Sequence, residues 1–246
     1  MKRVIAGPNA VTEAIRGGTR DVAAVYLADG LARAGADRLE RICRDAGVPC
    51  SSLPREALDA LAKGLTHQGV IAVAGDYPYV DVEAVLDEGR RDAEPLLVVL
   101  DQIQDPGNLG AIVRSAHALG AAGVILTRDR SAAMTPAAVR ASAGASELIR
   151  VARVGNLAQC LDRLRDSGYR AVGAAAEAEA RIDEIDWRGP TALVLGGEGK
   201  GLRRLSREHC DLLFRIPLAT AFDSLNVSVA AAIALYEIGR ARGRGR

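Results

Sequence analysis

The sequence predicts an α/β protein of two domains, in which a small α/β domain precedes a larger domain built on a parallel sheet. Three observations lead to this prediction. Short apolar runs recur after residue 95, mixed strand and helix patterns fill the first 75 residues, and an acidic segment separates the two regions. At 246 residues and 49% hydrophobic content, the chain is long enough to bury a core in each domain.

The N-terminal domain, residues 1–75, combines apolar runs typical of strands with segments whose apolar residues recur at helical spacing. Both patterns within so short a segment predict a small α/β sandwich. The predicted strands are 22–27 and 70–73, and the predicted helices are 10–16, 33–46 and 55–65.

Residues 76–95 differ sharply in composition from the segments on either side. They carry seven acidic and two basic side chains, and Pro78 and Pro95 bracket most of the acidic stretch. Such a change of composition is typical of a domain boundary. We therefore interpret this segment as an acidic interdomain linker that contains a short helix at 82–89.

Residues 96–246 form the larger predicted domain, in which short, nearly continuous apolar runs alternate with helical stretches. Strands that are covered on both faces need such runs, so the pattern predicts a parallel sheet flanked by helices. Ligands of these sheets bind outside the carboxyl ends of the strands, so a site is expected in the loops that follow them. The predicted strands are LLVVL (96–100), VILT (124–127), AVGAA (171–175), ALVLG (192–196) and LFRIP (213–217).

Charge, hydropathy and cysteine usage limit the possible classes. The net charge of +1 divides into +2 over 1–75, −5 over 76–95 and +4 over 96–246, so two mildly basic domains support RNA binding only weakly. No apolar run reaches the roughly 18 residues of a membrane span and the start lacks a signal-peptide pattern, so we expect a cytoplasmic protein with no membrane partner. The four cysteines and three histidines lack metal-ligand spacing, so no metal site is expected.

Three distant segments carry small residues and a few polar side chains just after predicted strands. Glycines in the second segment let backbone groups approach a ligand closely. This loop is no phosphate loop, because Gly201 rather than Ser or Thr follows Lys200. Alone it would be a plain tight turn, but the three segments together predict one shared site. They are DPGNLGAIVRSAHALGA (105–121), LGGEGKGL (195–202) and SLNVSVA (224–230).

These segments resemble the SpoU/TrmH family of RNA 2'-O-ribose methyltransferases, which belongs to the SPOUT superfamily. In the N-terminal domain, GPNAVTEAI (7–15) and THQGVIAVAG (66–75) resemble the substrate-binding domain of the branch that modifies a guanosine of 23S rRNA. The residues that carry the catalytic-domain resemblance are Asn108, Arg114, Gly197, Glu198, Gly201, Pro217, Ser224, Leu225 and Asn226.

The resemblance implies a fold and a reaction. The C-terminal domain is expected to be a SPOUT domain with a deep trefoil knot, and the N-terminal domain to be L30e-like. Two subunits are expected to form the site as a homodimer. S-adenosyl-L-methionine is the implied methyl donor, without a metal, and the implied partner is rRNA, with 23S favoured, or tRNA.

The resemblance also assigns roles to individual residues. Arg114 is expected to act on the target ribose; because a guanidinium is a poor base, stabilising an alkoxide or gripping phosphate is the safer role, and base action stays open. The implied catalytic residues are Arg114, Asn108, Glu198, Ser224 and Asn226. The implied cofactor-binding residues are Leu195, Gly197, Glu198, Gly201, Ile216, Leu218, Leu225 and Val227.

Simpler interpretations remain open for several of these positions. Asn108 would suit a plain helix cap, Arg114 a surface charge, and Ser224 a cap that leaves Asn226 in the first helical turn. Gly144, Ala145 and Glu147 match a family segment near the site, or form only a helix end and strand start. Thr220 departs from a family glycine and suggests an altered loop at 219–223. The arginine-rich tail, 240–246, contacts phosphate or is a frayed terminus.

Other functions remain alternatives to rRNA methylation. A tRNA 2'-O-methyltransferase would carry the same catalytic motifs. A noncatalytic RNA- or ribosome-binding protein should have lost Arg114, Glu198 or Asn226, and all three are present. A nucleotide-dependent oxidoreductase predicts a dinucleotide fingerprint, which would need glycine at Leu202.

Overall fold

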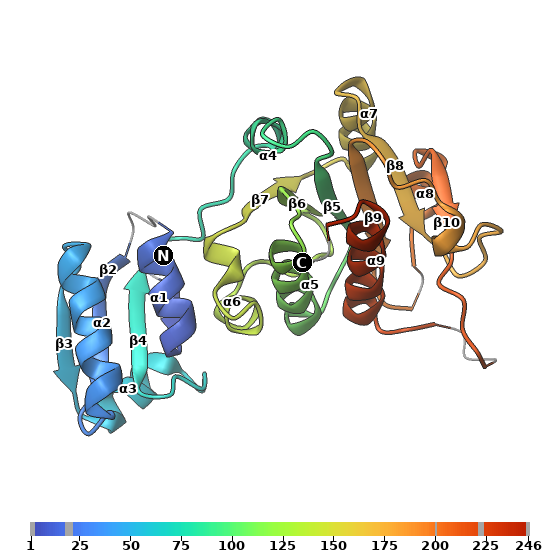
Figure 1. Cartoon of the computed structure of the whole chain (residues 1–246). Helices are drawn as coiled ribbons and strands as arrows, with labels where there is room; N and C mark the ends of the chain where they lie inside the picture. Colours follow the sequence, from blue (N-terminus) through green and yellow to red (C-terminus); the bar gives the residue numbers. More distant parts are fainter. Residues whose placement is uncertain (1–2, 18–21, 200, 221–223, 245–246) are drawn as a thin grey trace.

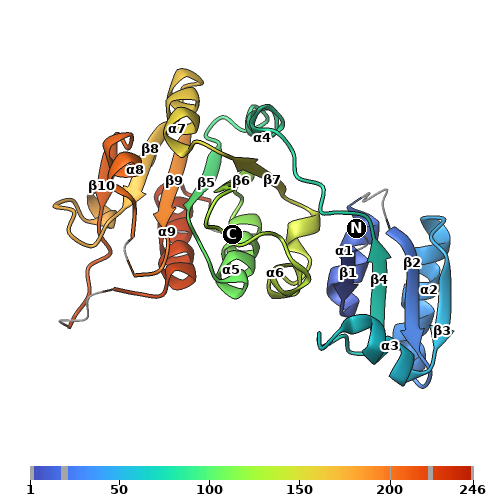
Figure 2. The same cartoon turned by 180° about the vertical axis from the view of Figure 1, so that it is seen from behind.

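The chain folds into two α/β units, each built on its own sheet (Figures 1 and 2). The structure, a computed structural model, describes residues 3–17, 22–199, 201–220 and 224–244. The two-domain α/β prediction is confirmed in its sheets: a mixed sheet of four strands comes first, and a sheet of six strands follows.

The N-terminal sheet has the strand order β1-β4-β2-β3. β4 runs antiparallel to β1 and β2, and β2 runs parallel to β3. The predictions missed β1 and β3, each four residues long, and β3 (CSSL) lacks an apolar run. The elements are β1 (Arg3–Ala6), α1 (Pro8–Arg16), β2 (Val22–Ala28), α2 (Arg33–Asp45), β3 (Cys50–Leu53), α3 (Arg55–Ala62) and β4 (Val70–Ala74).

The C-terminal sheet has the order β10-β8-β9-β5-β6-β7, and all of these neighbours pair in parallel. All six residues of the central strand β5 are buried, as its apolar run predicts. The prediction missed β7 (RVARV), whose arginines interrupt the apolar pattern, and it extended β10 beyond Phe214. The strands are β5 (Leu96–Asp101), β6 (Gly123–Thr127), β7 (Arg150–Val154), β8 (Arg170–Ala174), β9 (Thr191–Gly196) and β10 (Leu212–Phe214).

Helices cover both faces of this sheet. On one face, β5 residues Val98 and Leu100 share a core with α5, α6 and α9, while on the other Leu97 and Val99 pack with α4 and α7. The helices are α4 (Val82–Gly89), α5 (Pro106–Ala118), α6 (Pro136–Ala141), α7 (Leu157–Asp166), α8 (Arg204–Glu208) and α9 (Val227–Ala241), with single turns η1 (Ala145–Glu147) and η2 (Ile182–Glu184).

The acidic segment 76–95 is part of the second domain's packing rather than a free tether. Its helix α4 has the predicted bounds, and Val82, Val85 and Leu86 are buried against the sheet. Tyr77 and Tyr79 also pack against the core, and Val80 forms a bridge with Ala152 of β7. The acidic composition suggested a linker, but apolar residues recur within it at helical spacing, and these pack against the sheet.

A buried ion pair joins the two domains. Both nitrogens at the end of Arg3 donate to the carboxylate of Glu147 at 2.8 Å, and the two side chains are 8% and 0% exposed. The Arg3 guanidinium also lies 5.2 Å from the ring centre of Tyr77, whose hydroxyl donates to the carbonyl of Ser146 at 2.6 Å. Glu147 therefore holds the domains together at η1.

The C-terminal arginines at 242 and 244 are anchored rather than frayed. The Arg242 guanidinium donates to the carbonyls of Trp187, Glu94 and Gly189 at 2.7 Å each. Arg244 forms an ion pair with Asp92 at 2.7 Å. Arg242 thus contacts the segments before β5 and β9, and Arg244 contacts the segment before β5.

No helix in the described part of the chain is long and apolar enough to cross a membrane. The trefoil knot stays a prediction from the family resemblance.

The ion pair between the domains leads to a stability prediction. Replacing Arg3 by Met leaves the Glu147 carboxylate without its bidentate partner, and breaking a buried pair in this way costs about 3–5 kcal/mol. We expect a matching loss in the free energy of unfolding, measured by urea denaturation. In a double variant, Arg3→Met with Glu147→Leu, no buried carboxylate remains and part of the loss should be recovered; equal stability of wild type and Arg3→Met would contradict the assignment.

Candidate active site

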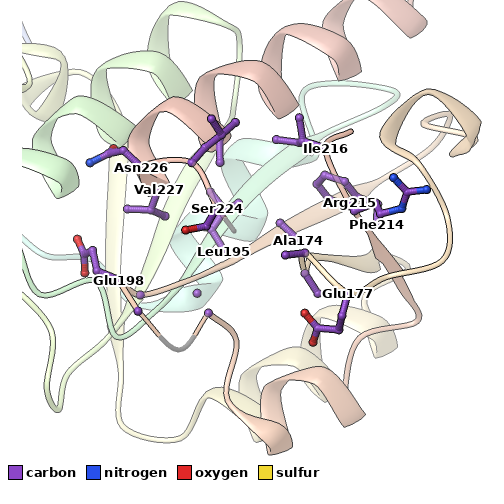
Figure 3. Close-up of a pocket in the computed structure, with 18 of the residues that line it drawn as sticks. Ala174, Glu177, Leu195, Glu198, Phe214, Arg215, Ile216, Ser224, Asn226 and Val227 are labelled. Atoms are coloured by element: carbon purple, nitrogen blue, oxygen red, sulfur yellow. The ribbon is translucent and has the colours of Figure 1, made fainter. Parts of the chain in front are cut away.

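A pocket of about 610 Å³ opens at the carboxyl ends of β8 and β9, where the second and third sequence motifs line it (Figure 3). The first motif joins them through hydrogen bonds of Asn108. Every predicted cofactor-binding residue lines it, and so do the predicted catalytic residues Glu198, Ser224 and Asn226. The lining residues are Ala174, Ala175, Ala176, Glu177, Leu195, Gly196, Gly197, Glu198, Gly199, Gly201, Arg207, Phe214, Arg215, Ile216, Leu218, Ser224, Leu225, Asn226, Val227 and Ala230.

The glycine loop after β9 is packed too tightly for side chains at two positions. The Gly197 N–H donates to the Asp101 carbonyl at 2.9 Å, and a Cβ on Gly197 would lie 2.2 Å from the Gln102 carbonyl oxygen. A Cβ on Gly196 would lie 2.0 Å from the backbone of Gly201. Glycine is therefore required here by close backbone approach, which leaves backbone groups on the pocket wall.

The carboxylate of Asp101 fixes the far end of this loop. Asp101 ends β5 and is fully buried. It accepts hydrogen bonds from the backbone N–H of Arg203 at 3.1 Å, from Arg203 Nε at 2.7 Å and from Ser206 Oγ at 2.6 Å. The sequence analysis did not single out Asp101, although a charged residue that closes a fully apolar strand was a usable signal.

A chain of hydrogen bonds between side chains joins the three motifs at the edge of the pocket. Asn108 Nδ2 donates to Glu198 Oε1 at 2.7 Å, and Asn226 Nδ2 donates to Asn108 Oδ1 at 3.1 Å. The backbone N–H of Gln104 donates to the other Glu198 oxygen at 3.3 Å. Figure 3 shows Glu198 and Asn226 on the same side of the pocket. Three of the predicted catalytic residues thus form one connected polar group.

Helix capping differs from the sequence interpretation. Asn226, not Ser224, caps α9, because Asn226 Oδ1 accepts from the backbone N–H of Ser228 at 2.8 Å. At α5 the cap is Asp105, whose carboxylate accepts from the Asn108 N–H at 2.7 Å. Asn108 is therefore free to bond Glu198, and Ser224 lies ahead of the helix on the pocket wall. Capping alone cannot account for Asn108.

Arg114 is not among the residues that line the pocket. It lies exposed on α5, and within the described chain it forms no hydrogen bond or ion pair. Close to α5, helix α9 leaves Val229, Ile233 and Tyr236 exposed, the last by 63%. The single chain thus assembles the pocket and the polar chain but leaves the predicted catalytic arginine outside them.

The chemical character of the pocket is mixed. Leu195, Phe214, Ile216 and Val227 supply apolar walls, and glycine backbone and the polar chain supply hydrogen-bonding groups. This combination suits a nucleoside-sized ligand with a flat apolar base and polar substituents. Among the described residues, no group of three or more His, Cys, Asp and Glu could hold a metal ion.

Three charged residues on the pocket wall, Glu177, Arg207 and Arg215, were not among the predicted site residues. Arg207 forms an ion pair with Glu177, and Arg207 Nε donates to the Leu202 carbonyl at 3.0 Å. Glu177 and Arg207 lie in segments without a recognisable motif, and Arg215 lies in the predicted strand 213–217.

In the suggested altered loop at 219–223, Ala219 and Thr220 are described and exposed, and 221–223 lie outside the described residues.

Comparison with known proteins identifies the family. The model of the SpoU rRNA Methylase family matches residues 95–236, and the model for RNA 2'-O ribose methyltransferase substrate binding matches residues 4–80. The second match covers the unit built on the four-stranded sheet, and the first covers nearly all of the six-stranded unit.

Full-length relatives agree with this result. The 23S rRNA (guanosine-2'-O-)-methyltransferase RlmB of Pseudomonas syringae pv. tomato is 42% identical over 98% of this chain and 97% of its own. A protein of Mycolicibacterium vanbaalenii described as an uncharacterized tRNA/rRNA methyltransferase is 43% identical over 97% of this chain and 76% of its own.

A solved structure shows the same overall arrangement. The SpoU methyltransferase AviRb from Streptomyces viridochromogenes, in complex with the cofactor AdoMet, superposes with a TM-score of 0.84 at 28% identity, over 100% of this chain and 92% of that one. The chain therefore belongs to the SpoU rRNA methylase family and begins with its RNA 2'-O-ribose methyltransferase substrate-binding domain.

Proposed function

We propose that this protein transfers a methyl group from S-adenosyl-L-methionine to the ribose 2'-hydroxyl of a guanosine in 23S rRNA, in the cytoplasm. The observation that carries the proposal is the convergence of all eight predicted donor-binding residues on one pocket, with Asn108, Glu198 and Asn226 bonded together at its edge. The RlmB relative is named for this guanosine chemistry and matches both domains.

The pocket fits the donor by its shape and by its backbone. Gly196 and Gly197 form a cradle that a Cβ would fill, so backbone groups can contact adenine and ribose. Leu195 and Ile216 give the base apolar surfaces, and Leu218 and Leu225 extend them. When bound, S-adenosylmethionine supplies a methyl group on a positively charged sulfur, ready for transfer to a nucleophile.

The protein's contribution to the reaction is placement and charge stabilisation. Holding hydroxyl oxygen and methyl carbon in line can contribute up to about 7–11 kcal/mol to lowering the barrier. The Glu198 carboxylate orients Asn108, which in turn orients Asn226, so the polar chain presents fixed groups to the incoming ribose. Arg114 stabilises the developing alkoxide or holds the adjacent phosphate, because a guanidinium offers several N–H donors and is a poor base.

A homodimer completes the site in this proposal. Arg114 lies outside the pocket of its own chain, and the neighbouring α9 exposes Val229, Ile233 and Tyr236 at helical spacing. An exposed apolar stripe of this kind is typical of a surface that another protein covers. A second copy packed on α9 would bury the stripe and bring its own Arg114 to the donor pocket of the first.

The choice of 23S rRNA over tRNA depends on the N-terminal domain. The donor pocket itself would serve either RNA. The RlmB relative, which is of nearly equal length and matches both domains, favours rRNA. A noncatalytic role is disfavoured because the polar chain is intact.

The test is transfer of tritiated methyl from S-adenosylmethionine to unmodified 23S rRNA, 16S rRNA and tRNA, followed by mapping of 2'-O-methyl sites. A single 23S guanosine is the expected product. A tRNA product would support the methyl-transfer reaction but contradict 23S rRNA as the substrate. No transfer to any of these RNAs would contradict the proposal that the protein is an enzyme.

Donor binding should depend on the glycine loop. In Gly197→Ala the new methyl group meets the Gln102 carbonyl at 2.2 Å, so the loop must shift. Overpacking of this kind costs about 1–3 kcal/mol, which corresponds to about a 5- to 150-fold weaker Kd for S-adenosylhomocysteine by calorimetry. Gly155→Ala is the control, since a Cβ there meets nothing within 4 Å. Equal weakening in both variants would argue against a specific role for Gly197.

Turnover should depend on Arg114 while donor binding does not. Arg114→Ala should lower kcat by about 10²–10³-fold, as loss of one stabilising group does, and leave the donor Kd unchanged. Mixing Arg114→Ala with Gly197→Ala subunits should restore part of the activity. In a mixed dimer, the intact donor pocket of the Arg114→Ala subunit faces the intact Arg114 of the Gly197→Ala subunit. No restoration after verified subunit exchange would show that Arg114 serves its own chain.

The apolar stripe on α9 should hold the dimer together. Ile233→Glu places a charge in the middle of the stripe, so sedimentation should give a monomer with much reduced methyl transfer. Exposed Gln159→Ala on α7 is the control and should leave both properties unchanged. A wild-type protein that sediments as a monomer while fully active would contradict the dimer.

A further inference from the structure

The turn Thr66–Gly69 in the first domain is held in place by a buried histidine. Its His67 is buried at 4% exposure. His67 Nδ1 accepts from the Gly69 N–H at 3.1 Å, so the ring hydrogen lies on Nε2, which donates to Asp59 Oδ1 at 2.8 Å. The imidazole therefore pins the turn to α3, and the methyltransferase pocket uses none of these contacts.

Two exposed polar residues, one in this turn and one at the end of α3, adopt a left-handed backbone. Gln68 has φ 50° and Lys63, which ends α3, has φ 48°. Both side chains are exposed. At Lys63 this conformation is a common way to end a helix. At Gln68 glycine would adopt it at lower cost, and non-glycine residues in this region cluster at functional sites. The Gln68 amide forms no hydrogen bond to the described part of the protein.

The loop lies at the boundary with the methyltransferase domain. Arg140 of α6 donates to Thr66 Oγ1 at 3.2 Å across this boundary. In both Figure 1 and Figure 2 the segment after α3 lies next to α6. α6 follows the carboxyl end of β6, which is the same edge of the parallel sheet as the donor pocket. The ion pair of Arg3 with Glu147 holds the domains so that this placement is kept.

We propose that Lys63, Gln68 and Arg140 form an RNA-contacting surface that crosses the domain boundary. The inference rests on the proposed function and adds a specificity-determining residue to it. Gln68 carries both a donor and an acceptor and can pair with the edge of an unstacked base, while Lys63 and Arg140 contact phosphates. Asp59 lies beside the turn, where its Oδ1 accepts from His67 at 2.8 Å and its side chain is 62% exposed. The partner is a folded rRNA segment with unpaired bases near the target nucleotide.

The test uses Gln68→Gly in the full-length protein. Glycine adopts the left-handed backbone readily and removes the exposed Gln68 side chain, so the melting temperature should hold or rise. We expect the KM for 23S rRNA to increase about tenfold, as for loss of one base contact, with kcat and the donor Kd unchanged. Gln159→Ala, on α7, is the matched control and should leave KM unchanged.

Salt dependence separates the phosphate contacts from the base contact. Arg140→Gln and Lys63→Gln should each reduce the slope of log Kd for rRNA against log salt by about 0.7–0.9, and Gln68→Gly should leave the slope unchanged. A Gln68→Gly protein whose KM stays within twofold of wild type, while wild type methylates rRNA, would overturn this inference alone. Failure of wild type to methylate any RNA would instead overturn the proposed function.

Discussion

The buried carboxylate of Asp101 is the interaction on which the donor pocket depends. A buried charge is costly unless it is paired and fully hydrogen-bonded, and Asp101 meets this requirement through Arg203 and Ser206. The same residue's carbonyl accepts from Gly197, so one position at the end of the central strand holds both ends of the glycine loop. The loop thereby presents Glu198 toward Asn108, and the polar chain through Asn226 follows.

A second constraint is the fixed relation of the two domains. Arg3 and Glu147 are buried together, Tyr77 packs against the arginine, and Arg140 reaches across to Thr66. Helix α4 of the acidic segment between the domains packs against the sheet, so the segment does not act as a flexible linker. An RNA bound to the first domain then meets the second domain in one orientation. This suits a reaction whose rate depends on the alignment of the ribose hydroxyl with the methyl donor.

The sequence predicted the parallel sheet and the pocket better than it predicted the residues that support them. Apolar runs identified β5, β6, β8 and β9 because strands covered on both faces have a strong pattern, whereas β7 carries arginines at the sheet's edge. Local spacing suggested Ser224 as the α9 cap, but Asn226 Oδ1 accepts the capping bond, while the Asn226 amide nitrogen makes the long-range bond to Asn108. No local pattern reveals the bond between Asp101 and Arg203 or the pair of Glu147 with Arg3, because the partners lie about a hundred residues or more apart in the sequence.

The most direct test of the central claim is a crystal structure with S-adenosylhomocysteine bound. The account predicts that adenine and ribose lie between Leu195, the Gly197 loop and Ile216, with the sulfur directed toward the edge where Asn108, Glu198 and Asn226 are joined. A ligand bound elsewhere, or a sulfur directed away from that polar chain, would contradict the assignment of this pocket as the site of methyl transfer.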